Sequence, residues 1–412
     1  MRVTIYAMSL PLPVDRYDRR VVGWLSLAQL VTWGSVFYTF ALLMEPIERE
    51  LGLSRAQSSL AFSLMLAMDG LLAYPVGRWI DQGHERRVVT AGSLLITAGL
   101  ALHTQVSGVI SFYAVWMLLG AGMAASAYNP VFAVVTRRYP QDFRRAIITL
   151  TFLGGLASTV FIPLTAWLID TWGWRAALGA LAVLPLVVCA PIHLRMLRDA
   201  PPPAAHTSSS QRPGPADEAG HVRLMRSAPF LLVGFFVVAM MGVVAALPAH
   251  MVSLLREAGL PPAWVVVVPA SIGVIQVVGR LGLFLMEQQG DPHRANRLIP
   301  LLIPLGLAVL LASQGSIALA LCFVLLFGLG NGMVTIVKGT AVAQYVSRQH
   351  VGALNGALGV PTALARASAP WLMGLLWSPE GGYTRGLWGL VVISLAATLA
   401  LWMAQRVARP PQ

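Results

Sequence analysis

The sequence predicts an all-α membrane protein. Hydrophobic residues make up 57% of the 412 residues and charged residues only 11%, whereas soluble domains carry roughly 45–50% and about 25%. The mean hydropathy of +0.70 exceeds what one soluble core can hide, because a globule needs more polar surface than this chain supplies. The apolar stretches show no alternation of period two, which favours helices over a membrane barrel.

Twelve apolar stretches are candidates for membrane-spanning helices, each of which needs about 20 residues to cross about 30 Å of hydrocarbon. The ninth is short and contains Pro300 and Pro304, so its limits are the hardest to define. In chain order the stretches are 22–44, 56–76, 88–106, 109–135, 146–169, 176–194, 228–249, 263–286, 298–312, 317–345, 351–377 and 387–404.

The arginines predict the orientation of these helices. The two tails and the even-numbered connections carry 21 arginines, and the odd-numbered connections carry five. Because cytoplasmic connections carry the excess of basic residues, both termini are expected in the cytoplasm, which fits an even number of crossings. The first 20 residues contain Pro11, Pro13 and several charges, so they do not fit a cleavable signal peptide.

A segment rich in Pro, Ser and Ala, residues 199–223, predicts a flexible cytoplasmic linker between two six-helix halves, 1–198 and 224–412. The halves show a weak repeat. The segment 118–123 resembles 326–331, and Ile162-Pro163 has a counterpart in Ala369-Pro370. Two repeated six-helix halves joined in this way are typical of membrane transporters.

The connection after the second stretch reads GRWIDQGHERR over residues 77–87. It contains a glycine, then an aspartate four residues later, then a second glycine and a basic pair. We expect Gly77 to allow close helix packing and Asp81 to pair with nearby arginines. The expected gating residues of this loop are Gly77, Asp81, Arg86 and Arg87.

Two further motifs occupy matching places in the chain. The segment 287–290, which begins with Glu287, is a degenerate copy of the loop after the eighth stretch, and the turn 172–175 reads WGWR. With the loop at 77–87, these motifs resemble the major facilitator superfamily over essentially the full length. The resemblance implies two pseudo-symmetric halves that work by alternating access in a cell membrane, the inner membrane in bacteria.

Within that superfamily, the first hundred residues resemble the bacterial monocarboxylate and oxalate–formate branch. The segments 33–35 (WGS) and 62–64 (FSL) carry this likeness. The likeness implies that Arg280, in the eighth stretch, anchors a substrate carboxylate.

Four charged residues lie inside apolar stretches: Asp69, Arg280, Lys338 and Arg366. Each costs about 2.5–3.5 kcal/mol on insertion scales and so calls for a role. Arg280, Lys338 and Arg366 are candidates for substrate binding, although Arg280 could be structural and Arg366 could donate to carbonyls freed by Pro370. Asp69 is a candidate for proton coupling, or it could only neutralise one of the cations.

Weaker candidates accompany these charges. Tyr128 and Asn129, in the fourth stretch, are opposite the Lys338 region according to the repeat, so substrate binding and packing are both open. His103 and His250 fall near the ends of their stretches and are interpreted as polar capping residues rather than ligands.

The sequence disfavours an enzyme, since it contains no HExxH or GxSxG motif and no Cys, His or acid cluster at metal spacing. No Gly-Lys dipeptide is present for a phosphate loop, so ATP is not expected as the energy source. The charge of +12 contains no basic run that would indicate a nucleic acid.

We therefore predict a monomeric secondary active transporter that needs no cofactor or metal and carries a small, monocarboxylate-like organic anion, with a proton as the candidate coupling ion. The alternatives are an exporter of drugs or other metabolites with the same fold and a non-transporting membrane sensor.

Overall fold

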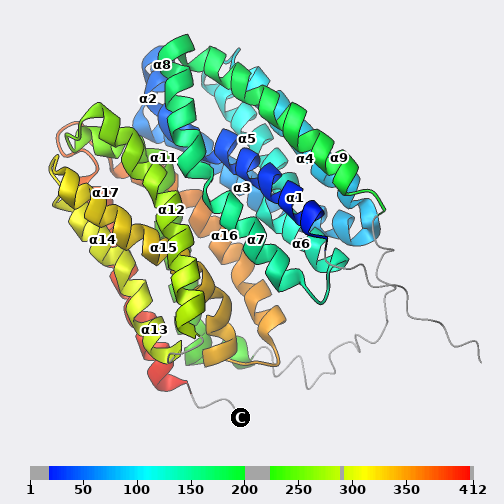
Figure 1. Ribbon diagram of the computed structural model, residues 1–412. Helices are drawn as coiled ribbons and strands as arrows, with labels where there is room; N and C mark the ends of the chain where they lie inside the picture. Colours follow the sequence, from blue (N-terminus) through cyan, green and yellow to red (C-terminus); the bar gives the residue numbers. More distant parts are fainter. Residues whose placement is uncertain (1–17, 200–222, 288–291, 409–412) are drawn as a thin grey trace, which may run out of the picture.

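The computed structural model describes residues 18–199, 223–287 and 292–408, and these residues form a bundle of long helices (Figure 1). Within these ranges the only strand-like pairing is an isolated bridge between Ser378 and Gly382. The all-α prediction is therefore confirmed. Most of the predicted linker, 200–222, lies outside the described residues.

The N-terminal bundle comprises the helices before the predicted linker. Asp18 caps its first helix by accepting a hydrogen bond from the Arg20 backbone N–H at 2.7 Å, and Ser54 forms a capping box with Gln57 at the start of α3. The elements are α1 (Arg19–Thr32), the π-helix η1 (Trp33–Tyr38), α2 (Phe40–Leu51), α3 (Arg55–Trp79), η2 (Ile80–His84), α4 (Glu85–His103), α5 (Val109–Ser126), α6 (Tyr128–Arg138), α7 (Phe143–Gly155), α8 (Ala157–Leu184), η3 (Pro185–Cys189) and α9 (Ala190–Met196).

The C-terminal bundle follows the same pattern of long apolar helices. The side chains of Ser227 and Ser316 accept backbone hydrogen bonds at the starts of α11 and α15, as residues at helix N-termini commonly do. The elements are α11 (Ala228–Glu257), α12 (Pro262–Glu287), α13 (Pro292–Leu298), η4 (Ile299–Leu301), α14 (Leu302–Leu311), α15 (Ile317–Tyr345), α16 (Val351–Leu376) and α17 (Thr384–Val407).

Eight described helical segments are long and apolar enough to cross a membrane. Two of these, Arg55–His103 and Phe143–Met196, contain 49 and 54 residues. Each is broken by a glycine with positive φ, Gly83 at 87° and Gly173 at 76°, a conformation that glycine adopts without the usual steric cost. A shorter apolar helix, Ala295–Leu311, corresponds to the ninth predicted stretch, and a 3₁₀ turn at Pro300 interrupts it.

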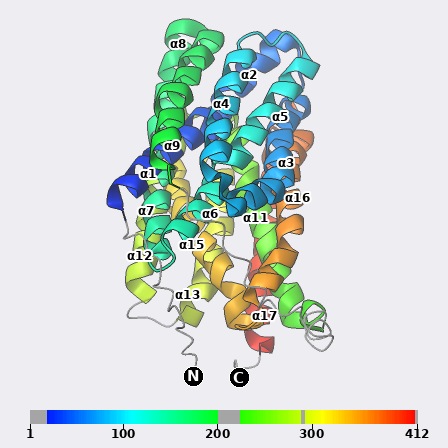
Figure 2. The same ribbon diagram turned by 90° about the vertical axis from the view of Figure 1, so that its right-hand side faces the viewer.

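The buried apolar side chains form two clusters, one for each bundle. The first belongs to the N-terminal bundle apart from Ala249 and Ala367, and the second belongs to the C-terminal bundle apart from Ala41. The bundles meet where α3 packs on α16, α8 on α12 and α2 on α11, and Figure 2 shows α3 beside α16. Each bundle thus has its own core, and the two bundles meet along these three pairs of helices.

Candidate functional site

A cavity of about 770 Å³ lies between the two bundles. Its exposed lining residues include Asn129, Ile148, Leu281 and Thr335. They come from the start of α6, from α7 and from the later halves of α12 and α15, so the cavity is open on the side that these segments form. Six residues singled out in the sequence line this one cavity: Asp69, Tyr128, Asn129, Arg280, Lys338 and Arg366. Their roles in binding and coupling stay predictions.

An aromatic wall covers the side of the cavity formed by the N-terminal bundle. The wall consists of Trp33, Phe37, Tyr38, Tyr128 and Phe132, all of which line the cavity. Ring centroids are 5.1 Å apart for Trp33 and Phe37, and 5.0 Å apart for Trp33 and Tyr128. Tyr128 also stacks on Phe132 at 5.3 Å. These spacings are typical of interacting aromatic pairs, so the rings form a continuous surface.

The π-helix η1 explains why Tyr38 belongs to this wall. In an α-helix, residues five apart, such as Trp33 and Tyr38, would point about 140° away from each other. A π-helix bonds residue i to residue i+5 and so brings Tyr38 toward the face that carries Trp33. Sequence reasoning did not find this wall, because helical periodicity alone gives no signal for a π-helical turn.

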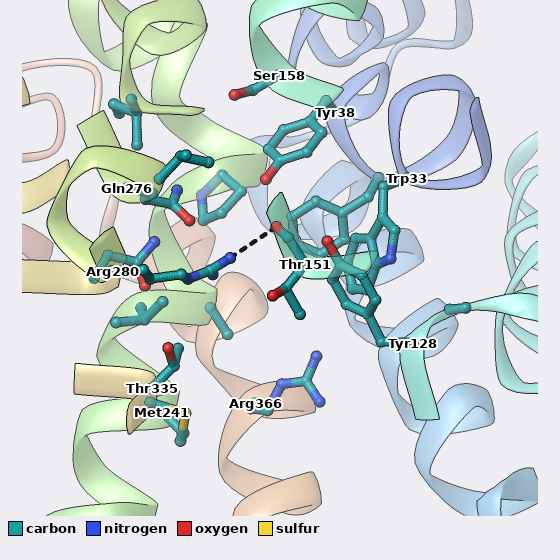
Figure 3. A pocket seen from close by; sticks show the side chains of 18 of the residues that line it. Trp33, Tyr38, Tyr128, Thr151, Ser158, Met241, Gln276, Arg280, Thr335 and Arg366 are labelled. Atoms are coloured by element: carbon teal, nitrogen blue, oxygen red, sulfur yellow. Dashed lines mark hydrogen bonds between the residues drawn. The ribbon is translucent and has the colours of Figure 1, made fainter. Parts of the chain in front are cut away.

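Arg280 extends from α12 across the cavity to the N-terminal bundle. Its Nη1 donates to the backbone oxygen of Thr151 at 3.0 Å, and Figure 3 shows Arg280 and Gln276 facing Tyr38, Trp33 and Tyr128. Two glycines in α7 make room for this arrangement. A Cβ atom on Gly154 would overlap the Tyr128 hydroxyl, and one on Gly155 would lie 2.8 Å from Val277.

The other three buried charges lie on α3, α15 and α16. Arg366 acts electrostatically on both Asp69 and Lys338. Asp69 nevertheless forms no ion pair within 4.0 Å with any described residue. Within the described ranges Arg366 makes no hydrogen bond to carbonyls near Pro370. The structure therefore does not support the alternative that Arg366 serves to satisfy carbonyls freed by this proline. The cavity therefore holds charges that are near each other but not locked in pairs.

The opposite end of the molecule is closed by a cluster around Arg55, at the start of α3. The Arg55 side chain is only 9% exposed, and its Nη2 lies 3.3 Å from Glu48 and 3.5 Å from Glu257. The guanidinium also lies 5.1 Å from the ring centroid of Trp377. Glu257 and Trp377 belong to the C-terminal bundle, so this closed end joins the bundles. In the sequence, Arg55 is one of the five arginines of the odd-numbered connections, between the first and second apolar stretches.

His250 extends this cluster into the C-terminal bundle. It is buried, with Nδ1 3.0 Å from the Tyr383 hydroxyl and Nε2 2.8 Å from the Pro370 backbone oxygen. Arg55 Nη1 donates to the same hydroxyl at 3.0 Å, and burial raises the pKa of Tyr383 so that it keeps its proton. Tyr383 therefore donates to His250, which in turn donates to Pro370. The expected capping role of His250 was therefore wrong. The sequence gives no signal for these hydrogen bonds, because they depend on the packing that buries His250.

The loop after α3 corrects the expectation that Asp81 pairs with nearby arginines. Asp81 is exposed and forms no ion pair with a described residue, whereas Glu85 is fully buried. Arg138 Nε lies 2.5 Å and Arg137 Nη1 3.3 Å from the Glu85 carboxylate. The turn at Gly83 places Glu85 at the start of α4, where it meets the end of α6.

The expectation for Gly77 was also wrong, because a Cβ atom there would meet nothing within 4 Å. Arg86 and Arg87 are exposed, and the side chain of Glu287 lies outside the described residues. The WGWR turn, in contrast, has a structural role. Trp174 Nε1 donates to Glu50 at 2.7 Å, and Arg175 Nη2 lies 2.5 Å from Glu50. This contact ties the turn to the end of α2.

His103 is likewise buried rather than a polar cap, and its Nε2 accepts a hydrogen bond from Trp116 Nε1 at 2.9 Å. Among the described residues, no three His, Cys, Asp or Glu side chains gather as metal ligands.

Similar proteins of known structure share this architecture. The nucleoside transporter NupG superposes with a TM-score of 0.73 at 12% identity, covering 94% of this chain and 98% of that one. A bacterial homolog of the human lysosomal transporter Spinster, in an inward-facing and occupied conformation, gives 0.71 at 16% identity, covering 95% and 97%. At such identities these likenesses show the fold.

Two relatives are similar in sequence. Monocarboxylate transporter 13 of Rattus norvegicus is 26% identical over 332 residues, which cover 77% of this chain and 71% of the relative. The 2-nitroimidazole transporter of Escherichia coli (strain K12) is 25% identical over 393 residues, covering 91% and 93%. The family model of the Major Facilitator Superfamily matches residues 25–370. With its apolar helices and central cavity, the chain belongs to the Major Facilitator Superfamily of membrane transporters, which are not enzymes.

Proposed function

We propose that this protein is a secondary active transporter that carries an organic anion through the cavity between its bundles. The observation that carries the proposal is the charge of the lining. Arg144, Arg280, Lys338 and Arg366 face the cavity, and Asp69 is the only acidic residue among the described lining residues. An excess of cations lining a cleft attracts an anionic ligand, and a substrate carboxylate would offset part of this charge.

The proposed topology has twelve crossings of the inner membrane in two six-helix halves. Both termini lie in the cytoplasm. The turns at Gly83 and Gly173 would divide two of the eight apolar segments into four crossings. The helices α13 to α14 and α16 would supply the remaining two. The excess of arginines on one side supports the orientation.

Transport would proceed by alternating access. In the present conformation the cluster around Arg55 closes one end, while exposed residues of α6, α7, α12 and α15 line the other. For the substrate to leave on the closed side, the contacts of Arg55 with Glu257 and Tyr383 must separate. Proton coupling would use Asp69, whose carboxyl lies in the cavity wall under the influence of Arg366.

The names of the relatives support two substrate classes. Similarity to a monocarboxylate transporter supports a carboxylate. The similarity to a 2-nitroimidazole transporter extends over more of this chain. Together with the aromatic wall, this similarity favours the alternative, an exporter of drugs or other metabolites with an uncharged ring. In that case the cavity cations would be structural.

Uptake by proteoliposomes separates these functions. We would screen labelled mono- and dicarboxylates and 2-nitroimidazole, with and without a pH gradient, and use protein-free vesicles as the baseline for passive permeation. Saturable carboxylate uptake that is lost in Arg280→Gln would support the anion carrier. Uptake of 2-nitroimidazole alone, unchanged in Arg280→Gln, would support the alternative.

A further inference from the structure

The aromatic wall and Arg280 face each other across the same cavity, and this juxtaposition bears on the kind of anion that fits. Arg280 acts electrostatically on the hydroxyl groups of both Tyr38 and Tyr128. Figure 3 shows the Tyr38 and Tyr128 rings across the cavity from the helix that carries Arg280. A carboxylate held by Arg280 would therefore have its carbon skeleton against the rings.

The size of the cavity argues against a short aliphatic acid as the best ligand. Its volume of about 770 Å³ is within the range of about 300–1,000 Å³ that holds drug-sized molecules. A two- or three-carbon acid anchored on Arg280 would leave most of this space to water and leave the aromatic wall uncovered. A ligand that covers the wall gains both the burial of apolar area and the contact with the rings.

The aromatic wall offers ring faces and edges rather than a general apolar surface. Tyr128 stacks on Phe132 with an angle of 21° between the ring planes, while Trp33 and Phe37 meet edge to face at 65°. A flat ring can extend such an arrangement by stacking or by an edge contact, whereas a puckered saturated ring cannot adopt either geometry.

The geometry of Arg280 complements this surface. One N–H group of its guanidinium is used by the Thr151 carbonyl, and a guanidinium carries five donors in a fixed plane. Two of the remaining donors can meet the two oxygens of a carboxylate at once.

We infer that the preferred substrate is an aromatic carboxylate, an anion whose carboxyl group binds Arg280 while its ring packs on Tyr128 and Trp33. The inference rests on the proposed function, because it takes the cavity cations as the anchor of the substrate. It adds a specificity role for the aromatic wall. Tyr128, from α6, and Trp33, from η1, would distinguish flat rings from saturated ones.

Calorimetric titration of the purified full-length protein tests the inference with ligands that differ in one property. Benzoate and 2-naphthoate carry a ring and a charge, cyclohexanecarboxylate carries the charge without an aromatic ring, and benzamide carries the ring without the charge. We expect benzoate to bind about twofold to tenfold tighter than cyclohexanecarboxylate, the range that corresponds to one aromatic pair. Benzamide should bind far more weakly than either.

Two variants of Tyr128 locate the preference. Tyr128→Leu removes the ring and should abolish the difference between benzoate and cyclohexanecarboxylate. Tyr128→Phe keeps the ring and should preserve the difference. Trp33→Leu provides an independent test if Tyr128→Leu does not fold, and the ligand comparison on the unaltered protein requires no variant.

The outcomes separate the inference from the proposed function. If both carboxylates bind equally and benzamide does not bind, the aromatic preference is wrong and the anion carrier stands. If benzamide binds as tightly as benzoate, the ring preference stands and the anion carrier is wrong. If neither benzoate nor 2-naphthoate binds at millimolar concentration, the inference is overturned.

Discussion

Nη1 of Arg280 lies 3.0 Å from the backbone oxygen of Thr151, and this hydrogen bond joins the two bundles inside the cavity. Arg280 belongs to α12 and Thr151 to α7. The bond occupies one N–H group of the guanidinium, so a second acceptor must approach the donors that remain. Any movement of the bundles that separates α7 from α12 would break it. Arg280 is therefore placed both to bind a ligand and to respond to the conformation of the protein.

Lys338 supplies the first prediction. Lys338→Gln should weaken binding of the transported anion roughly 30-fold or more, because removing one partner of a buried charged contact typically costs about 2–5 kcal/mol. Lys338→Arg should retain part of the affinity, since it keeps the positive charge in the cavity wall. Thermal-shift titration of correctly folded variants measures the effect, and equal affinity of Lys338→Gln and the unaltered protein would exclude Lys338 from the site.

Asp69 supplies the second prediction. If Asp69 exchanges a proton during the cycle, Asp69→Asn should abolish accumulation driven by a pH gradient but preserve exchange of substrate between the two sides. The amide keeps the size of the side chain but cannot release a proton. Parallel uptake and exchange assays in proteoliposomes make the comparison, and normal gradient-driven accumulation in Asp69→Asn would show that the proton is carried elsewhere.

The closed end supplies the third prediction. Arg55→Ala removes contacts to Glu257 and Tyr383, and a loss of about 1 kcal/mol would change the ratio of the two conformations roughly fivefold. An impermeant maleimide added at the closed end should then label Ala41→Cys, in the cavity wall, faster. The background for this test is Cys189→Ser with Cys322→Ser.

The matched control is Arg49→Ala. Arg49 is an exposed residue of α2 that donates only within its own helix among the described contacts. Equal labelling rates in Arg55→Ala and Arg49→Ala would show that the Arg55 cluster does not hold this end closed.

Glu85 and Asp81 supply the fourth prediction. Glu85→Gln should lower the thermal unfolding midpoint markedly, because breaking a buried ion pair typically costs about 3–5 kcal/mol and Glu85 forms ion pairs with both Arg137 and Arg138. Asp81→Asn should change stability by less than about 0.5 kcal/mol, as exposed substitutions usually do. The idea fails if the two variants unfold at the same temperature.

The sequence predicted much of the cavity because charged residues inside apolar helices are costly and rarely lack a role. Asp69, Arg280, Lys338 and Arg366 were found in this way, and all four line the cavity. Arg55 was missed because it falls at a helix start, where a charge is unremarkable until the packing of the two bundles buries it.

Local geometry accounts for the other differences. Tyr38 faces the cavity because η1 is a π-helix, and the pattern of apolar residues does not distinguish this from an α-helix. In the loop after α3, the motif directed attention to Asp81, but the turn at Gly83 buries Glu85 instead. Which side chain is buried in this loop depends on the φ angle of a single residue, Gly83. Composition and periodicity do not predict such an angle.

Calorimetric titration of Arg280→Lys with an organic carboxylate tests most directly whether this protein binds anions through Arg280. Lysine keeps the positive charge but loses the planar pair of donors that meets both carboxylate oxygens. We predict that Arg280→Lys, folded and purified like the unaltered protein, loses most of its affinity for a carboxylate that the unaltered protein binds. Equal affinity of the two proteins for that carboxylate would contradict an anion site at Arg280 and favour the exporter alternative.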